Sequence, residues 1–465
     1  MKRKTGLFTI IMFVLLGILL ITWFIPAGYF ENGQLSDLGM YRVGFFDFFQ
    51  LLFGSFQFAY FIQIVMLIVS VGALYGVLGK TGKYRALIER IASKFKGKEL
   101  VFLITCALFI AALTSAFDYG IATFIFIPAL VSIILAMNHS KITAFVATFG
   151  AYLAGIIGST INESIVVTIN SLLTDTTLSS GIWYKLALFV LSLGVIVFYL
   201  IRAKKVKGVK EQEDEDMFIG EKKSNKYSAI PIIVVFSILF VLLVLGCTGW
   251  QTVFGINIFT EFNTAITTWE IKGITVLAYI LGTISPLGEW YYAEMSVMCL
   301  LASLLIGRLY GLKLKDSFAA MVEGAKKMLP SALLVCLTYA VVYFSGNTMF
   351  FPTIADFILG ATSKFNLFLS SLTTALGSAL HVDMLYVSNY VLAQIAATST
   401  NHTLLALMFQ SLYGLTMFIV PTSAMLVLGL SYLGISYKEW IKASWKMILE
   451  LLVAIFVVLL IVMLI

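Results

Sequence analysis

Residues 100–137, LVFLITCALFIAALTSAFDYGIATFIFIPALVSIILAM, decide the fold, because two apolar arms of about 17 residues flank the polar turn Ser115–Gly120. A helix needs ~20 apolar residues to cross the hydrocarbon core of a bilayer, so each arm is too short to span it. Irregular backbone at membrane depth is tolerated only where protein buries it or where it lines a cavity. The stretch is therefore predicted to be a re-entrant hairpin, which enters the bilayer and returns on the same side.

A second pair of short apolar arms lies at 365–398, around the polar tip Gly377–Asp383. The same reasoning predicts a second re-entrant hairpin there. Each hairpin is followed by an apolar segment that is too long for one plain crossing, at 142–173 and at 404–432. A straight helix over 142–173 would extend about 48 Å, against a hydrocarbon core of ~30 Å.

Both long segments are interrupted by polar residues. The first contains Gly158–Ser164 (GSTINES), and the second contains Val420–Ala424 (VPTSA). Pro421 removes a backbone donor and favours a break in the second segment. Both segments are therefore predicted to be broken helices.

The order of hairpin, broken helix and terminal helix occurs twice in the chain. The spacing from tip to break is about 43 residues in one half and about 42 in the other, which is the internal symmetry of transporter repeats. We predict a first repeat at 1–201, a cytoplasmic linker at 202–228 that mixes both charge signs, and a second repeat at 229–465.

The amino-acid composition is typical of a membrane protein. Sixty per cent of the 465 residues are apolar and 12% are charged, about half the charge of a typical soluble domain, and the mean hydropathy is +0.99. Continuous apolar runs without strand alternation favour helices over a barrel. The predicted fold class is an all-α polytopic membrane protein with two inverted-topology repeats.

The net charge of +7 is a topology signal, because Lys and Arg in short loops resist translocation. Five segments hold 26 of the 31 Lys and Arg residues and are assigned to the cytoplasm: 1–5, 80–99, 202–228, 308–327 and 434–446. The first hairpin then enters from the cytoplasm and the second from outside, so the halves are inverted, with the amino terminus inside and the carboxyl terminus outside. This placement argues against a nucleic-acid partner.

Ionisable groups inside a membrane cost ~2.5–3.5 kcal/mol on insertion scales, so those at the tips and breaks are candidates for substrate and ion binding. Unwound carbonyls near Asn162 and Ser423 could coordinate a sodium ion, and a buried carboxyl could carry a proton. The alternative is that these residues cap helix ends. No metal cluster or other cofactor is expected. The candidates are Ser115, Asp118, Ser159, Thr160, Asn162, Glu163, Ser378, His381, Asp383, Thr422 and Ser423.

No Lys or Arg lies in the middle of a predicted span, whereas Asp118, Glu163 and Asp383 lie near the predicted midplane. This favours a substrate with an ammonium or guanidinium group, such as arginine or ornithine, moved by exchange or ion coupling. The alternative is a carboxylate or dicarboxylate carried together with sodium or protons. The roles of Glu289, Glu294 and Glu450 stay open between site and helix–helix hydrogen bonds.

Two stretches, Trp23–Phe30 (WFIPAGYF) and 421–446 (PTSAMLVLGLSYLGISYKEWIKASWK), resemble the YfcC/DcuC-type carriers, the C4-dicarboxylate anaerobic carrier group of the ion transporter superfamily. The resemblance implies a homodimeric, elevator-type carrier with a scaffold and a moving transport domain. It implies that Pro421 belongs to the second broken-helix motif with Thr422 and Ser423. Asn162 matches the first motif in part, since Glu163 stands where the family continues with a proline-containing stretch.

The sequence favours a secondary transporter of a small charged metabolite over two other classes of protein. A membrane-embedded enzyme lacks support, because no HExxH or GxGD motif occurs and the three histidines are not clustered. A channel fits less well, because two inverted half-sites suit alternating access better than a continuous pore.

Overall fold

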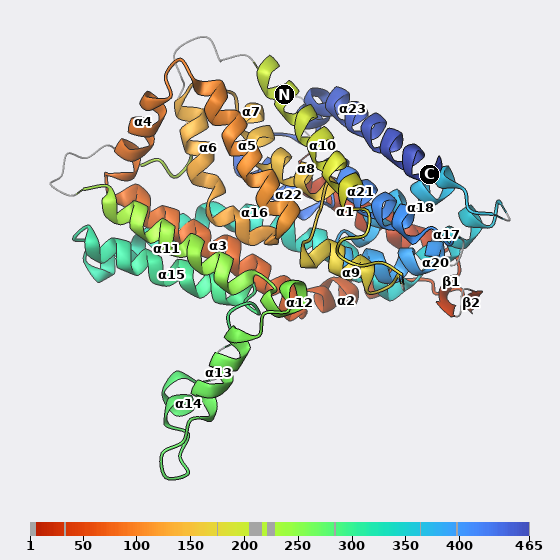
Figure 1. The fold of residues 1–465 in the computed structure, drawn as a ribbon, viewed down its shortest axis with the longest axis horizontal. Helices are drawn as coiled ribbons and strands as arrows, with labels where there is room; N and C mark the ends of the chain where they lie inside the picture. The colour runs from red at the N-terminus through yellow and green to blue at the C-terminus, as the bar shows by residue number, and fades with distance from the viewer. Residues whose placement is uncertain are drawn as a thin grey trace.

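The computed structural model describes residues 6–31, 34–173, 175–203, 216–220, 228–282, 285–362, 364–396 and 399–464. Within these ranges the chain is mostly helical, as predicted, and it contains one antiparallel pair of short strands, β1 (Ala27–Glu31) and β2 (Gln34–Gly39). Eight helices of the described chain are long and apolar enough to cross a membrane. Figure 1 shows an elongated helical body from which a smaller arm projects.

One group of helices packs around α3 and α16, and we call it the α3–α16 layer. α3 lies against both α15 and α16, α16 also contacts α1 and α2, and α11 packs on α15. Figure 1 shows α3, α11 and α15 side by side. The bounds are α1 Leu7–Ile21, α2 Phe45–Phe56, α3 Ala59–Lys80, α11 Ile230–Cys247, α15 Tyr292–Leu309 and α16 Leu314–Thr348.

Glycines bring the backbones of α3 and α16 into close contact. A Cβ added to Gly72 would lie 2.7 Å from the carbonyl oxygen of Gly324, and one added to Gly76 would collide with the carbonyl oxygen of Ala320. Gly72 and Gly76 have the small-xxx-small spacing that lets helices approach closely in a membrane, where packing rather than water drives association.

The second group packs around α8 and α21, and we call it the α8–α21 layer. α8 contacts α5, α10 and α21, while α21 also contacts α18 and α23. The two layers meet where α16 packs against α18 and α22. The bounds are α5 Glu99–Ala116, α7 Lys141–Phe145, α8 Ala151–Ile157, α10 Ile182–Arg202, α18 Leu367–His381, α21 His402–Ile419, α22 Ala424–Leu433 and α23 Tyr437–Leu464.

The first hairpin region and the broken segment after it are interrupted where the sequence predicts. α5 ends at Ala116, and the chain turns through Asp118, whose φ of 48° marks a sharp reversal, before the 3-10 turn η1 (Gly120–Ile125) and α6 (Ile127–Ala136). In the following segment a π-helical turn, η2 (Val146–Gly150), joins α7 to α8, and α8 ends at Ile157. Helical structure then resumes only at η3 (Glu163–Val167) and α9 (Thr168–Asn170).

The second half shows the same pattern. α18 ends at His381, Val382 has a φ of 50°, and the return arm contains α19 (Met384–Val387), η5 (Ser388–Leu392) and α20 (Ala393–Ala396). The break between α21 and α22 comes at 420–423, which contains Pro421.

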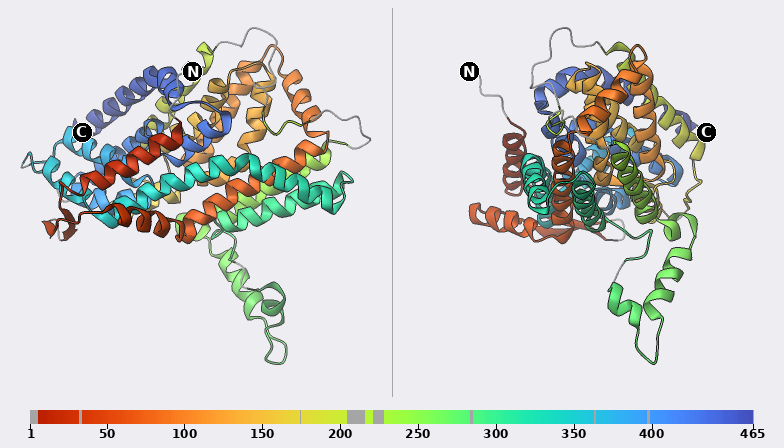
Figure 2. Two further views of the ribbon diagram at one scale, coloured as in Figure 1. Left: turned by 180° about the vertical axis from the view of Figure 1, so that it is seen from behind. Right: turned by 90° about the vertical axis from the view of Figure 1, so that its left-hand side faces the viewer.

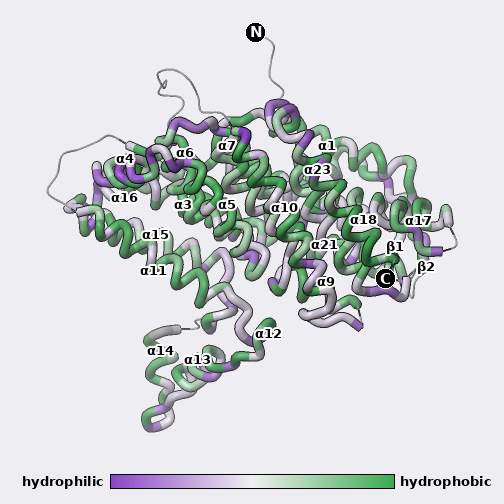
Figure 3. The backbone as a smooth tube through the Cα atoms, turned by 45° about the horizontal axis from the view of Figure 1, so that its top comes forward, coloured by the Kyte–Doolittle hydropathy of each residue, from purple (hydrophilic) through white to green (hydrophobic). Residues whose placement is uncertain are grey.

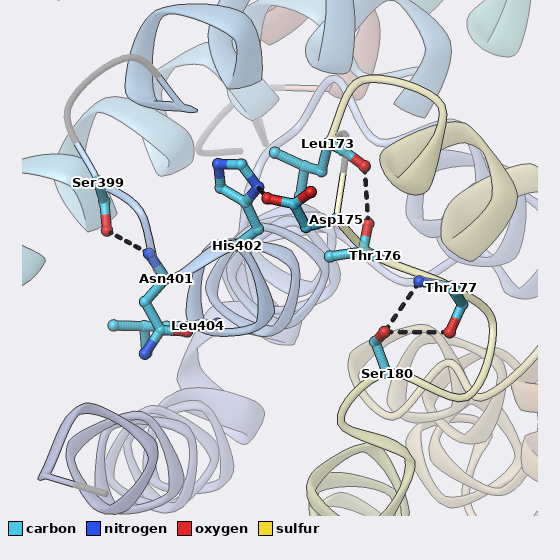
Figure 4. Close-up of polar contacts among 9 residues, drawn as sticks. All are labelled: Leu173, Asp175, Thr176, Thr177, Ser180, Ser399, Asn401, His402 and Leu404. Atoms are coloured by element: carbon cyan, nitrogen blue, oxygen red, sulfur yellow. Dashed lines mark hydrogen bonds and ion pairs between the residues drawn. The ribbon is translucent and has the colours of Figure 1, made fainter.

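The open ends of the two hairpins lie at opposite ends of the molecule in Figure 1, one near α4 (Tyr84–Lys94) and α7, the other near α17 (Phe351–Leu359) and α20. At the second end, the loop after α9 meets the start of α21 (Figure 4). His402 Nδ1 lies 3.6 Å from Asp175 Oδ2, and Asn401 Oδ1 accepts the Leu404 N–H at 3.0 Å as a helix cap. These two loops therefore share one face of the protein.

Hydropathy predicts a long span at 273–307, in which Ser285–Glu289 (SPLGE) could form a third irregularity. The structure divides this segment, so a continuous span is wrong. α14 (Val276–Leu281) and α15 are separate helices, because the chain between them turns at Gly282 and Gly288, whose φ values are 69° and 103°. With α12 (Trp250–Phe254) and α13 (Ile258–Thr268), α14 forms the projecting arm seen in Figure 2.

The charged segment 308–327, which the sequence assigns to the cytoplasm, is largely helical, because α16 begins at Leu314. Figure 3 shows hydrophobic segments through the body and hydrophilic ones beside α4 and α7, where loops are predicted to be cytoplasmic. Of the predicted linker 202–228, only residues 202–203, 216–220 and 228 lie within the described ranges.

Candidate functional site

A cavity of about 810 Å³ lies where the hairpin tips and helix breaks meet the α3–α16 layer. Both tips contribute, through Asp118 and Asp383, and both breaks contribute, through Glu163 and Ser423. α3 and α16 supply Tyr60 and Tyr339, and α15 supplies Tyr292. The structure thus brings four of the predicted site residues to one cavity.

Asp118 is held at the first tip by its own layer. Its Oδ1 atom accepts hydrogen bonds from the Tyr152 hydroxyl at 2.6 Å and from the Gly120 N–H at 3.2 Å. Tyr152 lies on α8, the first half of the broken helix. The short bond from a phenol fixes the carboxylate at the cavity wall and leaves acceptor capacity on its oxygens.

Asp383 is held at the second tip by the other layer. Its Oδ1 accepts the Leu385 N–H at 3.1 Å, so the residue caps α19, while its Oδ2 accepts a hydrogen bond from the Tyr60 hydroxyl at 3.3 Å. Tyr60 belongs to α3 and packs among Phe61, Tyr292 and Tyr339. The contact from Tyr60 to Asp383 therefore joins the two layers.

Glu163 begins η3, directly after the first break, and contacts the base of the projecting arm. Its Oε1 accepts a hydrogen bond of 2.7 Å from the Thr252 hydroxyl on α12. A Cβ added to Gly249 would collide with the Glu163 carboxylate, so this residue has to lack a side chain for the contact to form. The third acid of the cavity, like Asp383, is held by a hydroxyl from a segment outside its own layer.

The start of α22 is an uncapped helix amino terminus in the cavity wall. Ser423, Ala424 and Met425 line the cavity, and within the described residues no side chain caps this helix. The first N–H groups of a helix have no intrahelical partner and carry the positive end of its dipole. An anionic group in the cavity can bind there.

Four of the predicted site residues in the first half do not line the cavity, and three of them tie the hairpin to the broken helix. The Ser115 hydroxyl donates to the Gly158 carbonyl at 2.6 Å, and the Thr160 hydroxyl donates to the Ser115 carbonyl at 3.0 Å. The Ser159 hydroxyl donates to the Ile156 carbonyl at 2.9 Å within its own turn. These contacts shape the break, as the capping alternative predicts.

Asn162, the fourth, has every polar side-chain atom bonded to protein. Its Nδ2 donates to the carbonyls of Thr114 and Ser115, both at 3.2 Å, and its Oδ1 accepts the N–H groups of Ile165 at 2.9 Å and Val166 at 3.4 Å. Asn162 is therefore the amino-terminal cap of η3, and a sodium ion at this side chain would have to displace these partners.

Thr422 and Ser378 behave similarly in the second half. The Thr422 hydroxyl donates to the Ala379 carbonyl at 2.8 Å, which ties the second break to the second hairpin, and the Ser378 hydroxyl donates to the Thr374 carbonyl at 2.7 Å. Pro421 lies in the interruption itself and is not among the cavity-lining residues.

His381 is buried at the end of α18, outside the cavity wall. Its ring stacks on Tyr390, with centroids 4.7 Å apart, and meets Phe351 edge-on. Neither ring nitrogen has a hydrogen-bond partner among the described residues.

The cavity wall also contains tyrosines that are not among the predicted site residues. Eight tyrosines line it: Tyr60, Tyr119, Tyr152, Tyr291, Tyr292, Tyr339, Tyr386 and Tyr413. Two of them hold the acids of the hairpin tips, and aromatic faces also attract cations. A tyrosine within an otherwise apolar span was the available signal, but it is equally typical of packing.

The three glutamates whose roles the sequence leaves open lie outside the cavity wall. Glu294 caps α15, since its Oε2 accepts the Tyr291 N–H at 2.9 Å. Glu289 and Glu450 are exposed, the latter on α23. None of the three is among the cavity-lining residues.

The cavity is acidic. Three carboxylates line it, and no Lys, Arg or His of the described chain is among the lining residues. Coulomb attraction between unit charges is stronger here than in water, because the surrounding protein has a lower effective dielectric constant. A cationic group is therefore favoured beside Asp118 and Asp383.

A multi-helix membrane body whose hairpin tips and helix breaks meet at an internal polar cavity is typical of a secondary transporter. The comparison with known families agrees: residues 5–464 match the family described as "C4-dicarboxylate anaerobic carrier" (DcuC). The chain belongs to this family. It is therefore a multi-pass membrane transporter and not an enzyme.

Curated proteins and solved structures are similar to the chain. "Putative basic amino acid antiporter YfcC" of Escherichia coli (strain K12) is 22% identical over 448 residues, covering 89% of this chain and 80% of that protein. An uncharacterized protein of Haemophilus influenzae is 23% identical over 312 residues, covering 65% and 54%.

Of the structures, the YdaH transporter of Alcanivorax borkumensis has a TM-score of 0.46 at 15% identity, covering 98% of this chain and 97% of that one. MtrF of Neisseria gonorrhoeae, described as one of a class of antimetabolite efflux pumps, has a TM-score of 0.41 at 12% identity, covering 98% and 95%.

Proposed function

We propose that this transporter exchanges basic amino acids, such as arginine and ornithine, across the cytoplasmic membrane. The observation that carries the proposal is the charge of the cavity, with Asp118, Glu163 and Asp383 in its wall and no basic side chain among the described lining residues. A guanidinium or ammonium group would bind between the tip carboxylates, with the tyrosine faces around it.

The uncapped start of α22 suits the other end of such a substrate. The α-carboxylate of an amino acid would bind the free N–H groups at Ala424 and Met425. The corresponding amino terminus in the first half, that of η3, is already capped by Asn162. The cavity thus offers one anion site beside three acids, which fits one carboxylate plus a cation better than two carboxylates.

A second candidate is a dicarboxylate carried with sodium or protons, and the description of the family favours it. In that case the acids would bind the coupling cations rather than the substrate. The distant similarity to a protein named as a basic amino acid antiporter favours the first candidate.

We further propose an elevator mechanism in which the α8–α21 layer, which contains the hairpin and the broken helix of each of two inverted repeats, moves against the α3–α16 layer within a homodimer. The support is the repeated order of hairpin and broken helix, with open hairpin ends at opposite ends of the molecule (Figure 1). The asymmetry of Lys and Arg supports a cytoplasmic amino terminus and an external carboxyl terminus.

Counterflow in proteoliposomes tests the substrate. Vesicles loaded with unlabelled ornithine should take up labelled arginine rapidly, and Asp118→Asn and Asp383→Asn should abolish this exchange because each removes a charge that the cation needs. Glu450→Gln is the matched control, since it neutralises an exposed acid on α23 that is outside the cavity wall. Counterflow of succinate or malate without any response to arginine, ornithine or lysine would exclude the basic amino acid and leave the second candidate.

A further inference from the structure

Residues 216–220 (DMFIG) are packed into the protein, although the composition of the linker around them predicts a solvated chain. Asp216 is 6% exposed, Phe218 is 2% exposed and Ile219 is 9% exposed. The segment lies between α10 and α11, at the end of the protein where the loops are predicted to be cytoplasmic. A cavity of about 580 Å³ adjoins it. We call this segment the linker plug.

One side of the linker plug binds the α3–α16 layer and α4. Lys327 Nζ on α16 donates to the Met217 carbonyl at 2.8 Å, and Arg85 Nη1 on α4 donates to the Gly220 carbonyl at 3.2 Å. A Cβ added to Gly79 on α3 would lie 2.8 Å from the Phe218 carbonyl oxygen, so a glycine is required for this approach.

The other side binds α22, in the α8–α21 layer. The Tyr432 hydroxyl donates to Asp216 Oδ2, and the Phe218 ring stacks on the Tyr432 ring at an interplanar angle of 19°. Asp216 Oδ1 accepts the Phe218 N–H at 2.8 Å, which folds the segment into a compact turn. Phe218 also contacts Tyr75 of α3, with ring centroids 5.7 Å apart. One aromatic side chain therefore touches both layers.

We propose that the linker plug is a cytoplasmic latch that holds the two layers together and must release before they can move relative to each other. The proposal rests on the elevator mechanism proposed above and adds its regulation. Any sliding of α22 past α3 would separate Tyr432 from Tyr75, and Phe218 and Asp216 could not keep contact with both sides. Docking of the plug would stop transport, and its release would permit it.

The latch responds to cytoplasmic pH, because its acid is buried. Burial raises the pKa of Asp216 from 3.8 to about 6, against the opposing effects of the hydrogen bond from Tyr432 and the charge of Lys327. The other titratable groups facing it are Tyr75 and Tyr84. The adjoining cavity adds Lys80, Arg85 and Glu323, and Lys80 is paired to Glu323 at 3.0 Å.

The direction of the pH effect on docking follows from the pKa of Asp216 in the docked and in the released plug. The docked plug binds a proton more tightly than the released plug, so acidification favours docking and ionisation above pH 6 opposes it. With a docked pKa of about 6 and a released value of 3.8, the docking constant is roughly tenfold larger at pH 5 than at pH 7. The latch is thus a brake that engages when the cytoplasm becomes acidic.

Spin labelling of the full-length protein tests the latch without any substrate. In a background free of other cysteines, Met217→Cys carries the label, because Met217 is at the surface of the docked segment and is 36% exposed. We expect an immobile and a mobile component, with the ratio of immobile to mobile about tenfold larger at pH 5 than at pH 7. A spectrum that does not change between these pH values would overturn the proposal.

Two variants separate the chemistry of the latch from a general change in the fold. Asp216→Asn keeps the shape and one accepting oxygen, places an NH2 donor against the Tyr432 oxygen, and cannot ionise, so the label should be immobile at both pH values. Tyr432→Phe keeps the ring stack and removes one hydrogen bond, so the mobile fraction should rise at both. A mobile label in Asp216→Asn would contradict the assignment of Asp216 as the sensing group.

The regulatory step is then measured as an exchange rate at pH 7, with whichever substrate the counterflow assay supports. Asp216→Asn should exchange several-fold more slowly than the wild type, and Tyr432→Phe should not be slower. Unchanged exchange in Asp216→Asn, despite an immobile label, would refute the brake. Failure of the proposed substrate would leave the spin-label result intact, so the two proposals fail separately.

Discussion

Replacing Asn162 with alanine is expected to destabilise the folded protein by about 2–4 kcal/mol rather than to act on substrate alone. The amide lies 1% exposed between the first hairpin and the first break. Its loss removes the cap of η3, worth about 1 kcal/mol. It also removes the hydrogen-bond donor to the Thr114 carbonyl. This carbonyl lies in the last turn of α5, where carbonyl groups have no partner within the helix. Leaving it buried and unpaired costs about 1–3 kcal/mol.

The Ser115 carbonyl adds little to this sum, because it keeps other donors. It accepts the Thr160 N–H at 2.8 Å and the Thr160 hydroxyl at 3.0 Å in addition to Asn162. The expected loss therefore comes from the cap and from Thr114.

The assay is the unfolding midpoint of the purified protein in detergent, measured beside substrate affinity on the fraction that remains folded. Ser423→Ala is the matched control, because Ser423 holds the corresponding position before α22 and its side chain makes no cap within the described residues. Its stability should stay within about 0.5 kcal/mol of the wild type. An Asn162→Ala variant with wild-type stability and lost affinity would refute the capping assignment and return Asn162 to the binding site.

Two further predictions concern the layers. Tyr60→Phe should strengthen arginine binding up to about fivefold, because the hydroxyl that competes with the substrate for Asp383 is worth about 1 kcal/mol, and weaker binding in a direct binding assay would show that Tyr60 instead orients the acid. Gly76→Ala should destabilise the protein by about 1–3 kcal/mol and lower its unfolding midpoint, because the new Cβ collides with Ala320 on α16. Gly194→Ala on α10 is the control and should leave the midpoint unchanged, because nothing lies within 4 Å of the added Cβ. Equal midpoints for the two variants would contradict the close packing of α3 and α16.

The interruptions of the fold could be predicted from sequence, because a polar residue inside an apolar run is costly in a membrane unless the helix ends there or protein binds the polar group. Asp118 and Asp383 mark the tips, Pro421 marks the second break, and each lies where a helix ends in the structure. In the segment 273–307 the sequence indicates an irregularity at Ser285–Glu289, but hydropathy alone does not show that turns at Gly282 and Gly288 end the span, so the separate helix α14 could not be predicted.

The sequence could not predict which candidate residues line the cavity and which only stabilise the helix ends around it. Asn162 and Glu163 are adjacent in the chain, yet the first is a fully bonded cap and the second lines the cavity, a difference that depends on which side of η3 each side chain takes. The burial of Phe218 could not be predicted either, because its neighbours in the linker are charged. It is buried only because it packs between Tyr75 and Tyr432 in the folded protein.

The contacts of the three cavity acids give a physical reason for exchange rather than net transport in the proposed mechanism. Asp118 is bonded to Tyr152 within its own layer and keeps this partner during any movement. Asp383 and Glu163 are bonded to Tyr60 and Thr252, which lie outside that layer, so movement of the layer removes both hydroxyls. A hydrogen bond to a charged group is worth about 1.5–3 kcal/mol, and the loss is smaller for Glu163, whose bond to Thr252 is exposed. A bound cation would replace the lost hydroxyls, so the loaded carrier can move and the empty one is held back, which is the condition for antiport.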